Sequence, residues 1–173
     1  MKAAINSKGQ LPVKTLLVVF SYHHMNTEKV AGVFSKVLEA QVKKPQQTNP
    51  EELKDYDFIG FGSGIDSAKH YKELLDFADT LPQAAGKKAF IFSTSAIMGK
   101  DKVAKDHSAL REKLQAKGYV IVDEFACKGF NTNSFLKYIG GMNRGRPNAE
   151  DLRQAEEFAL NLKLKTQYEM NGE

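Results

Sequence analysis

The sequence predicts an α/β protein built on a doubly wound, five-stranded parallel sheet with strand order 2-1-3-4-5. Short apolar runs alternate with longer stretches of helical periodicity, and the connections between the runs are too long for hairpins. Alternation of this kind produces a parallel sheet with helices on both faces. In such a sheet a ligand binds over the carboxyl ends of the strands, near the first and third.

Four apolar runs are predicted to be strands, and a fifth run is weaker. Residues 14–20 are rich in Leu and Val, as expected for a strand buried on both faces. The other strong runs cover 57–62, 88–92 and 119–125, and the weak one covers 41–44. The strong runs fix the core of the predicted sheet.

Helical periodicity fills the stretches between these runs. The predicted helices cover residues 27–41, 69–81 and 103–117, and a last one opens at 147–151. Asn26 or Thr27 is expected to cap the first helix, and Asn49 followed by Pro50 predicts a short helical segment. Gly32 in the first helix is expected to allow close approach to the sheet.

The composition is that of one globular domain. Hydrophobic residues make up 42% and charged residues 27% of the 173 residues, which excludes bulk disorder. We expect residues 1–13 to form an N-terminal arm and 166–173 a frayed tail. The net charge of +4 is spread in alternating signs, and no recognised module indicates a nucleic-acid partner.

Cysteine usage and hydropathy indicate a location. The single cysteine, Cys127, cannot form an intrachain disulfide, which suits a reducing cytoplasm. No signal-peptide pattern is present, and no run approaches the roughly 18 apolar residues of a membrane span. We therefore expect a cytoplasmic protein without a membrane partner. The sequence leaves its oligomeric state open.

Polar loops follow the first, third and fourth predicted strands, at 21–27, 63–71 and 93–99. These loops should lie side by side at one edge of the sheet. The first leads directly into a helix, whose N-terminal N–H groups and dipole favour an anion such as phosphate. The hydroxyls of Ser21 and Thr27 can bind that phosphate together with backbone amides. No carboxylate pair or nucleophile–base–acid set is evident, so the loops suit ligand binding better than acid–base catalysis.

Over residues 14–162 the chain resembles the flavodoxins and flavodoxin-like FMN-binding proteins. The first loop resembles the family's Ser/Thr-x-Thr-Gly-Asn-Thr phosphate loop and keeps Ser21, Asn26 and Thr27. It has one extra residue, with 23–25 (His-His-Met) where Thr-Gly is expected. Residues 63–66 stand where the family's second loop meets the flavin edge, and 93–99 where its third loop covers the ring.

This resemblance implies non-covalent FMN and electron transfer between redox partner proteins. It also implies that the Gly64 region offers a backbone carbonyl to the N–H of the reduced flavin. The expected cofactor-binding residues are Ser21, Tyr22, His23, Asn26, Thr27, Ser63, Gly64, Ile65, Asp66, Ser93, Thr94, Ser95, Met98 and Gly99.

The chain departs from the family in two respects. It has no Trp, so Tyr22, Ile65, Tyr71, Met98 or Phe130 would have to cover the flavin ring. It is also basic, with a pI of about 9.0, whereas typical flavodoxins are strongly acidic. A basic protein implies either acidic redox partners or partners unlike those of the acidic flavodoxins. It also implies a less negative potential for the reduced flavin.

Several alternatives remain open at this point. The main one is an enzyme of the same fold, an FMN-dependent NAD(P)H or quinone reductase; another is a partner-binding module without cofactor. Adjacent His23 and His24 are poorly placed to chelate a metal, so none is expected. A response-regulator receiver domain is disfavoured because the first strand ends without acidic residues. We expect His70 and His107 to lie on the surface.

Overall fold

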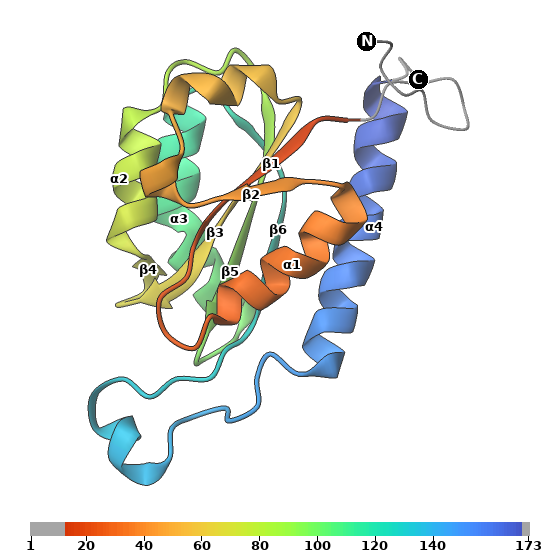
Figure 1. Cartoon of the computed structure of the whole chain (residues 1–173). Coiled ribbons are helices and arrows are strands. Elements are labelled where there is room, and N and C mark those ends of the chain that lie inside the picture. The colour runs from red at the N-terminus through yellow and green to blue at the C-terminus, as the bar shows by residue number, and fades with distance from the viewer. Residues whose placement is uncertain (1–12, 171–173) are drawn as a thin grey trace.

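The computed structural model describes residues 13–170, in which five parallel strands form a sheet of order β2-β1-β3-β5-β6 (Figure 1). These strands are β1 (Thr15–Phe20), β2 (Gln41–Lys43), β3 (Phe58–Asp66), β5 (Lys88–Ser95) and β6 (Val120–Lys128). The predicted fold class and strand order are confirmed. A short antiparallel strand, β4 (Lys69–His70), pairs with the end of β3 and was not predicted.

Two helices cover each face of the sheet. Helices α1 (Asn26–Leu38) and α4 (Ala149–Met170) lie on one face, and α2 (Lys72–Thr80) and α3 (Lys100–Ala116) on the other (Figure 1). Helix α4 continues to Met170, beyond the end expected near Lys165. None of the helices within residues 13–170 combines the length and apolar character needed to cross a bilayer.

Three short 3-10 helices complete the described structure: η1 (Pro45–Gln47), η2 (Pro50–Asp55) and η3 (Ser134–Ile139). The predicted cap of η2 is confirmed, since the Asn49 side chain accepts a hydrogen bond from the Glu51 N–H at 3.1 Å. This cap turns the chain from the edge strand β2 toward the start of β3.

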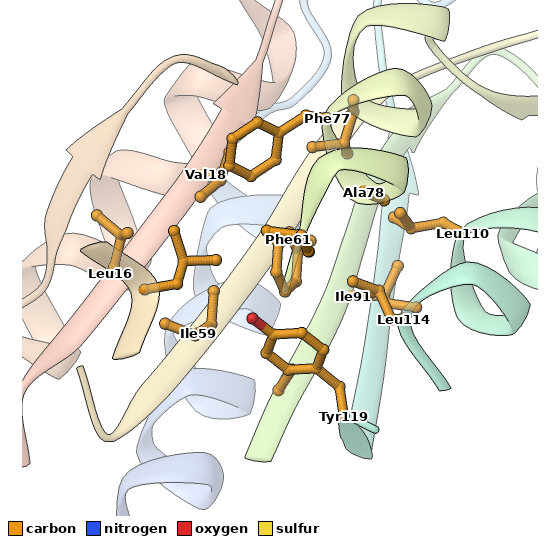
Figure 2. Packing of buried hydrophobic residues seen from close by; sticks show 14 of the residues in the cluster. Leu16, Val18, Ile59, Phe61, Phe77, Ala78, Ile91, Leu110, Leu114 and Tyr119 are labelled. Carbon is orange, nitrogen blue, oxygen red and sulfur yellow. The ribbon is translucent and has the colours of Figure 1, made fainter. Parts of the chain in front are cut away.

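Each face of the sheet has its own apolar core. On the α2/α3 face, Leu16, Ile59 and Ile91 of the strands belong to one buried cluster with Leu110 and Leu114 of α3 (Figure 2). On the α1/α4 face the core is aromatic, with Phe34 of α1 set among Phe90, Phe92, Phe125 and Phe158. Full burial of one such side chain contributes about 1.5–3 kcal/mol.

Strands β3, β5 and β6 extend further at their carboxyl ends than the apolar runs predicted. Ser63 pairs with Ser93 and Gly64 with Thr94, so the ladder continues after the side chains turn polar. Ser67 and Ala68 then adopt left-handed conformations, with φ of 50° and 61°, and turn the chain back into β4. Several predicted loop residues therefore lie on strands, where the sheet fixes their positions.

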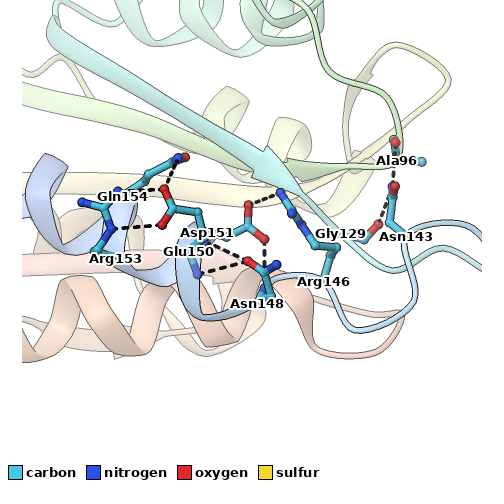
Figure 3. A network of polar contacts seen from close by, with 9 residues as sticks. All are labelled: Ala96, Gly129, Asn143, Arg146, Asn148, Glu150, Asp151, Arg153 and Gln154. Atoms are coloured by element: carbon cyan, nitrogen blue, oxygen red, sulfur yellow. Dashed lines mark hydrogen bonds and ion pairs between the residues drawn. The ribbon is translucent and has the colours of Figure 1, made fainter.

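A long segment, the β6–α4 connection (residues 129–148), projects from the carboxyl end of the sheet (Figure 1). Its base is held by Asn143, whose Nδ2 donates to the carbonyls of Ala96 and Gly129 at 2.7 and 3.3 Å (Figure 3). Its end is held by Asp151, which accepts from Arg146 at 2.5 Å and from the Asn148 N–H at 2.8 Å. The connection is thereby tied to both neighbouring elements.

Candidate functional site

A narrow polar pocket opens at the carboxyl ends of the parallel strands, with a volume of about 40 Å³. Four segments and Tyr71, which precedes α2, line it: the segments are the β1–α1 connection with the first turn of α1, the ends of β3 and β5, and the β6–α4 connection. Its lining residues are Ser21, Tyr22, His23, Asn26, Thr27, Gly64, Ile65, Tyr71, Thr94, Ser95, Ala96, Gly129, Phe130, Asn131 and Asn133. The predicted meeting of separate strand–helix connections therefore occurs in the structure.

The N-terminus of α1 reaches this pocket without a side-chain cap. The residue before the helix is Met25, and both His24 and Met25 are left-handed, with φ of 55° and 52°. The expected capping role of Asn26 or Thr27 is wrong, because both lie within the first turn. Uncapped first-turn N–H groups at a helix N-terminus form an anion-binding site.

The side chains of this first turn connect α1 to the β6–α4 connection and to the end of β5. Asn26 Nδ2 donates to the Phe130 carbonyl at 2.8 Å, and Thr27 Oγ1 lies 2.8 Å from Thr94 Oγ1. The buried Asn26 Oδ1 has no hydrogen-bond partner among the described residues.

A wider hollow of about 450 Å³ adjoins the pocket. Tyr22, His23, Tyr71 and Asn133 line both spaces, so the two are continuous. The Tyr71 ring contacts Phe20 edge to face, with centroids 5.6 Å apart, and burial followed by the Asp66 charge raises the pKa of its phenol. Tyr22 on the opposite loop is 66% exposed, so an aromatic side chain is available to cover a flat ligand.

The charge of the site differs from that of the whole chain. Asp66 and Glu73 line the hollow, and no Lys or Arg among residues 13–170 lines the hollow or the pocket. The net charge of +4 is therefore carried by other parts of the molecule. An anion in the narrow pocket would be held by neutral N–H and O–H groups.

The predicted site residues divide into two groups. Most of them line the pocket or the hollow: Ser21, Tyr22, His23, Asn26, Thr27, Gly64, Ile65, Asp66, Thr94 and Ser95. Four do not: the hydroxyls of Ser63 and Ser93 lie at hydrogen-bond distance from buried histidines, and Met98 and Gly99 lie where the chain enters α3. Pairing along β3 and β5 explains the first pair, because neighbouring residues of a strand face opposite sides.

Sequence reasoning missed most of the contribution of the β6–α4 connection. His24 Nε2 lies 2.8 Å from Thr132 Oγ1, and the His24 and Phe130 rings are 4.3 Å apart. Gly129 is needed there, because a Cβ on it would lie 2.9 Å from Asn26 Nδ2. The available signal was the run Asn131-Thr132-Asn133, whose polar composition after a strand matches that of the other three segments.

The expectation that His70 and His107 lie on the surface is wrong, since they are only 1% and 0% exposed. Their rings lie 5.0 Å apart. Ser63 Oγ is 2.8 Å from His70 Nδ1, and Ser93 Oγ is 2.7 Å from His107 Nε2. We call Ser63, His70, Ser93 and His107 the serine–histidine cluster. It lies at the carboxyl end of the α2/α3 face.

Two charged side chains, Glu124 and Arg111, continue the hydrogen bonds of this cluster toward the surface. Glu124 accepts from His107 Nδ1 at 2.8 Å and from Arg111 Nε at 2.5 Å. Burial opposes ionisation of Glu124, but the hydrogen bonds from His107 and Arg111 prevail and lower its pKa to about 2. Burial, and then the neighbouring His107, hold the pKa of His70 well below its ordinary value.

The pocket lies at the carboxyl ends of a doubly wound parallel sheet, which is where proteins of this fold class bind their ligands. A model of the flavodoxin domain matches residues 17–159, and the chain belongs to this family. It is 40% identical over 150 residues to an uncharacterized protein of Methanocaldococcus jannaschii, MJ0298, covering 87% of this chain and 98% of that protein.

Solved structures resemble the fold. Oxidised flavodoxin 2 from Bacillus cereus superposes with a TM-score of 0.65 at 19% identity, covering 88% of this chain and 99% of that one. A flavodoxin from the domain Archaea gives 0.59 at 17% identity, with 89% and 99% covered. A WrbA-like flavodoxin from Agrobacterium tumefaciens gives 0.63 at 16%, with 90% and 98% covered. At these identities the likeness establishes the fold.

Proposed function

We propose that the protein binds FMN non-covalently and carries electrons between redox partner proteins in the cytoplasm. The observation that carries the proposal is the uncapped N-terminus of α1, which opens into a narrow pocket beside a larger, aromatic-lined hollow. The small space matches a phosphate, and the volume of about 450 Å³ is enough for a tricyclic ring. When bound, the flavin supplies the redox chemistry.

The protein's own residues have separate tasks in this proposal. The Ser21 hydroxyl and the first-turn N–H groups of α1 donate to the phosphate, while Tyr22 and Tyr71 flank the ring and exclude water from it. The carboxylates of Asp66 and Glu73 disfavour additional negative charge in the hollow. They make the potential of the bound flavin more negative, whereas the positive net charge of the chain makes it less negative.

An absorbance spectrum of the purified protein, followed by denaturation and analysis of the released chromophore, tests the assignment. We expect bound or added FMN to give a flavin spectrum and to be released intact. We also expect FMN to bind at least tenfold more tightly than riboflavin, because the α1 N-terminus would hold the phosphate. A chain that binds neither flavin is a cofactor-free module and refutes the proposal.

Two serines linked to α1 provide a matched comparison. Ser21 lines the pocket, whereas Ser35 donates to the Ala40 carbonyl at 2.6 Å at the other end of the helix. We expect Ser21→Ala to weaken FMN binding severalfold and to leave riboflavin binding unchanged. Ser35→Ala should leave FMN affinity unchanged. Equal losses in both variants would mean that Ser21 does not contact the phosphate.

Adding NADH or NADPH to the loaded protein separates the carrier from its enzymatic alternative. A carrier keeps its oxidised spectrum, because it takes electrons from a partner protein. Rapid bleaching by either nucleotide alone would identify an FMN-dependent NAD(P)H or quinone reductase instead. A quinone titration of the reduced protein then distinguishes these two reductases.

The surface beside the site supports an acidic partner. From residue 125 to 149 the chain has no acidic residue, but it carries Lys128, Lys137, Arg144 and Arg146. Tyr138 and Ile139 in η3 are 79% and 68% exposed. Basic groups around exposed apolar side chains favour docking of a protein with surface carboxylates.

Charge reversal tests this docking surface with two carriers of opposite charge, an acidic ferredoxin and a basic cytochrome c. We expect Lys137→Glu with Arg144→Glu to slow electron exchange with the ferredoxin and to quicken it with the cytochrome. Lys44→Glu with Lys54→Glu, in the segment between β2 and β3, is the matched control and should change both rates little. Equal effects of the two double variants would contradict the proposed surface.

A further inference from the structure

The serine–histidine cluster lies next to the candidate site through Ser63, which precedes Gly64, and the function proposed above assigns no task to it. Ser63 and Ser93 are register partners on adjacent strands and are 0% and 1% exposed. Each hydroxyl is bonded to one imidazole of the buried pair. The two serines thus have the same burial and the same kind of partner, and they differ in what else they touch.

Ser93, His107 and Glu124 have the spacing of a nucleophile, a base and an acid. The distances are 2.7 Å from Ser93 Oγ to His107 Nε2 and 2.8 Å from His107 Nδ1 to Glu124 Oε2. However, Ser93 is buried and does not line the pocket or the hollow. No substrate reaches its hydroxyl, so this arrangement has a structural role.

Ser63, in contrast, contacts the backbone of the site. Its Oγ lies 2.8 Å from the carbonyl oxygen of Gly64, and it accepts from the Tyr71 N–H at 3.2 Å. Gly64 lines the pocket, and a Cβ on it would lie 2.6 Å from the Tyr71 ring. The Gly64 peptide is therefore held between the Ser63 hydroxyl and an aromatic side chain of the hollow.

The positions of the protons follow from the partners. The hydroxyl of Ser63 has one proton and two candidate acceptors, the Gly64 carbonyl and His70 Nδ1. His70 Nε2 is buried and has no partner among the described residues. A buried N–H without a partner is rarer and costlier than a bare acceptor, so the proton of the neutral ring belongs on Nδ1. Nδ1–H then donates to Ser63, and Ser63 donates to Gly64.

We propose that the Ser63 hydroxyl, oriented by His70, is the positioning group that fixes the Gly64 carbonyl beside the flavin and thereby sets the flavin's redox potential. This inference rests on the proposed function. Reduction of a flavin adds ring N–H groups that seek an acceptor. The Gly64 carbonyl already accepts from Ser63, so it is a weaker acceptor for an N–H of the flavin ring. Ser63 therefore weakens the binding of the reduced flavin relative to the oxidised flavin.

Two variants test the idea with Ser93 as the matched control. In Ser63→Ala the Gly64 carbonyl loses its donor, so we expect reduced FMN to bind about threefold to tenfold more tightly relative to oxidised FMN, the worth of one neutral hydrogen bond. Ser93→Ala also removes a buried hydroxyl bonded to a histidine, but it should leave this ratio unchanged. An unchanged or opposite ratio in Ser63→Ala, or an equal change in both variants, would overturn the proposal.

A second measurement needs neither a variant nor a cofactor. Nitrogen-15 NMR of the wild-type histidine rings should show His70 protonated at Nδ1 and bare at Nε2, and the carbon-13 shift of the Gly64 carbonyl should be that of a hydrogen-bonded group. A proton on Nε2 would refute the proposed orientation even if FMN binds. A protein that shows the expected shifts but ignores FMN would refute the proposed function and its redox consequence, leaving only the hydrogen-bond chain.

Discussion

The two faces of the sheet differ most at the carboxyl ends of the strands. Along β5, Phe90 and Phe92 face α1 and α4, and that cluster stays apolar as far as Cys127 on β6. The other side of the same strand starts with Ala89 and Ile91 but then presents Ser93. One face thus stays apolar until the Thr27–Thr94 contact at the pocket, whereas the other changes to a buried cluster of two serine–histidine pairs.

This difference separates two roles that one sheet must fulfil. Buried aromatic side chains stabilise the fold and tolerate small shifts in direction. Buried hydrogen-bonded groups add little net stability, but they fix orientation, because a misaligned partner leaves an unsatisfied polar atom. We therefore expect substitutions on the aromatic face to change stability and those in the polar cluster to change site geometry and pH dependence.

The largest effect is expected from Phe34→Ala, which would break the aromatic face. The Phe34 ring centroid lies 5.0 Å from that of Phe92 and 5.6 Å from those of Phe90 and Phe125. Its removal should cost about 3–5 kcal/mol of unfolding free energy, because a fixed sheet cannot close the cavity. Urea unfolding measures this loss. A cost below about 1 kcal/mol would show that the face repacks freely.

Glu124→Gln tests the charged hydrogen bonds that Glu124 accepts from His107 and Arg111 at the edge of the serine–histidine cluster. The pKa of about 2 lies below the ordinary 4.5, so the folded state favours the carboxylate. This stability is present above pH 4.5 and is lost as the pH falls toward 2. Allowing for the partly exposed side chain, we expect a loss of about 2 kcal/mol at pH 7. Unfolding curves at pH 7 and pH 3 should differ less in the variant than in the wild type.

His70 gives the same face a pH dependence in a different range. Because burial lowers the pKa of His70, the folded protein resists a proton that the unfolded chain accepts below about pH 6.5. Stability should fall by about 1.4 kcal/mol per pH unit as the pH drops below that value. His70→Gln should remove this slope in calorimetric scans between pH 7 and 5. An unaltered slope would mean that His70 binds its proton equally in the folded and unfolded states.

The reactivity of the Cys127 thiol tests whether solvent reaches the aromatic core near the carboxyl end of β6. Burial, and then the charge of Asp151, raise the pKa of its thiol to about 12. We expect the native protein to react with a thiol reagent only on unfolding, and Cys127→Ala to cost on the order of 1 kcal/mol. Fast labelling of the folded chain would show an opening in this face.

The smallest effect is expected from Gly32→Ala, on the outer side of α1. The expectation that Gly32 lets the helix approach the sheet is wrong, because a Cβ there would meet nothing within 4 Å. Alanine should therefore stabilise the protein by about 0.5–1 kcal/mol through helix propensity. Thermal unfolding measures the gain. Destabilisation would reveal a contact on that side.

The strands and helices that follow from hydrophobic periodicity could be predicted from the sequence. The features that depend on left-handed backbone turns and on buried polar pairs were missed. The apolar runs identified the central strands and their order. Strand β4 was missed because Ser67 and Ala68 make its left-handed turn without Gly or Asn. His107 was assigned to the surface by residue type, although its spacing to Leu110 and Leu114 places it on the buried side of α3.

For the site, polar composition located the pocket only in the three loops that the sequence analysis singled out. Polar residues after the first, third and fourth strands led to the pocket, and most of the predicted residues line it. Ser63 and Ser93 share that composition but face the other way, since strand pairing continues through them. Their direction depends on register, which composition does not contain.

The position of the β6–α4 connection in the chain has a consequence for biosynthesis. Phe130 and Thr132 hold Asn26 and His24, so a wall of the pocket comes from residues made long after the loop they enclose. During translation the pocket therefore stays incomplete until this connection and the core helix α4 that follows it have been made. A ligand that needs the whole pocket can stabilise only the completed domain.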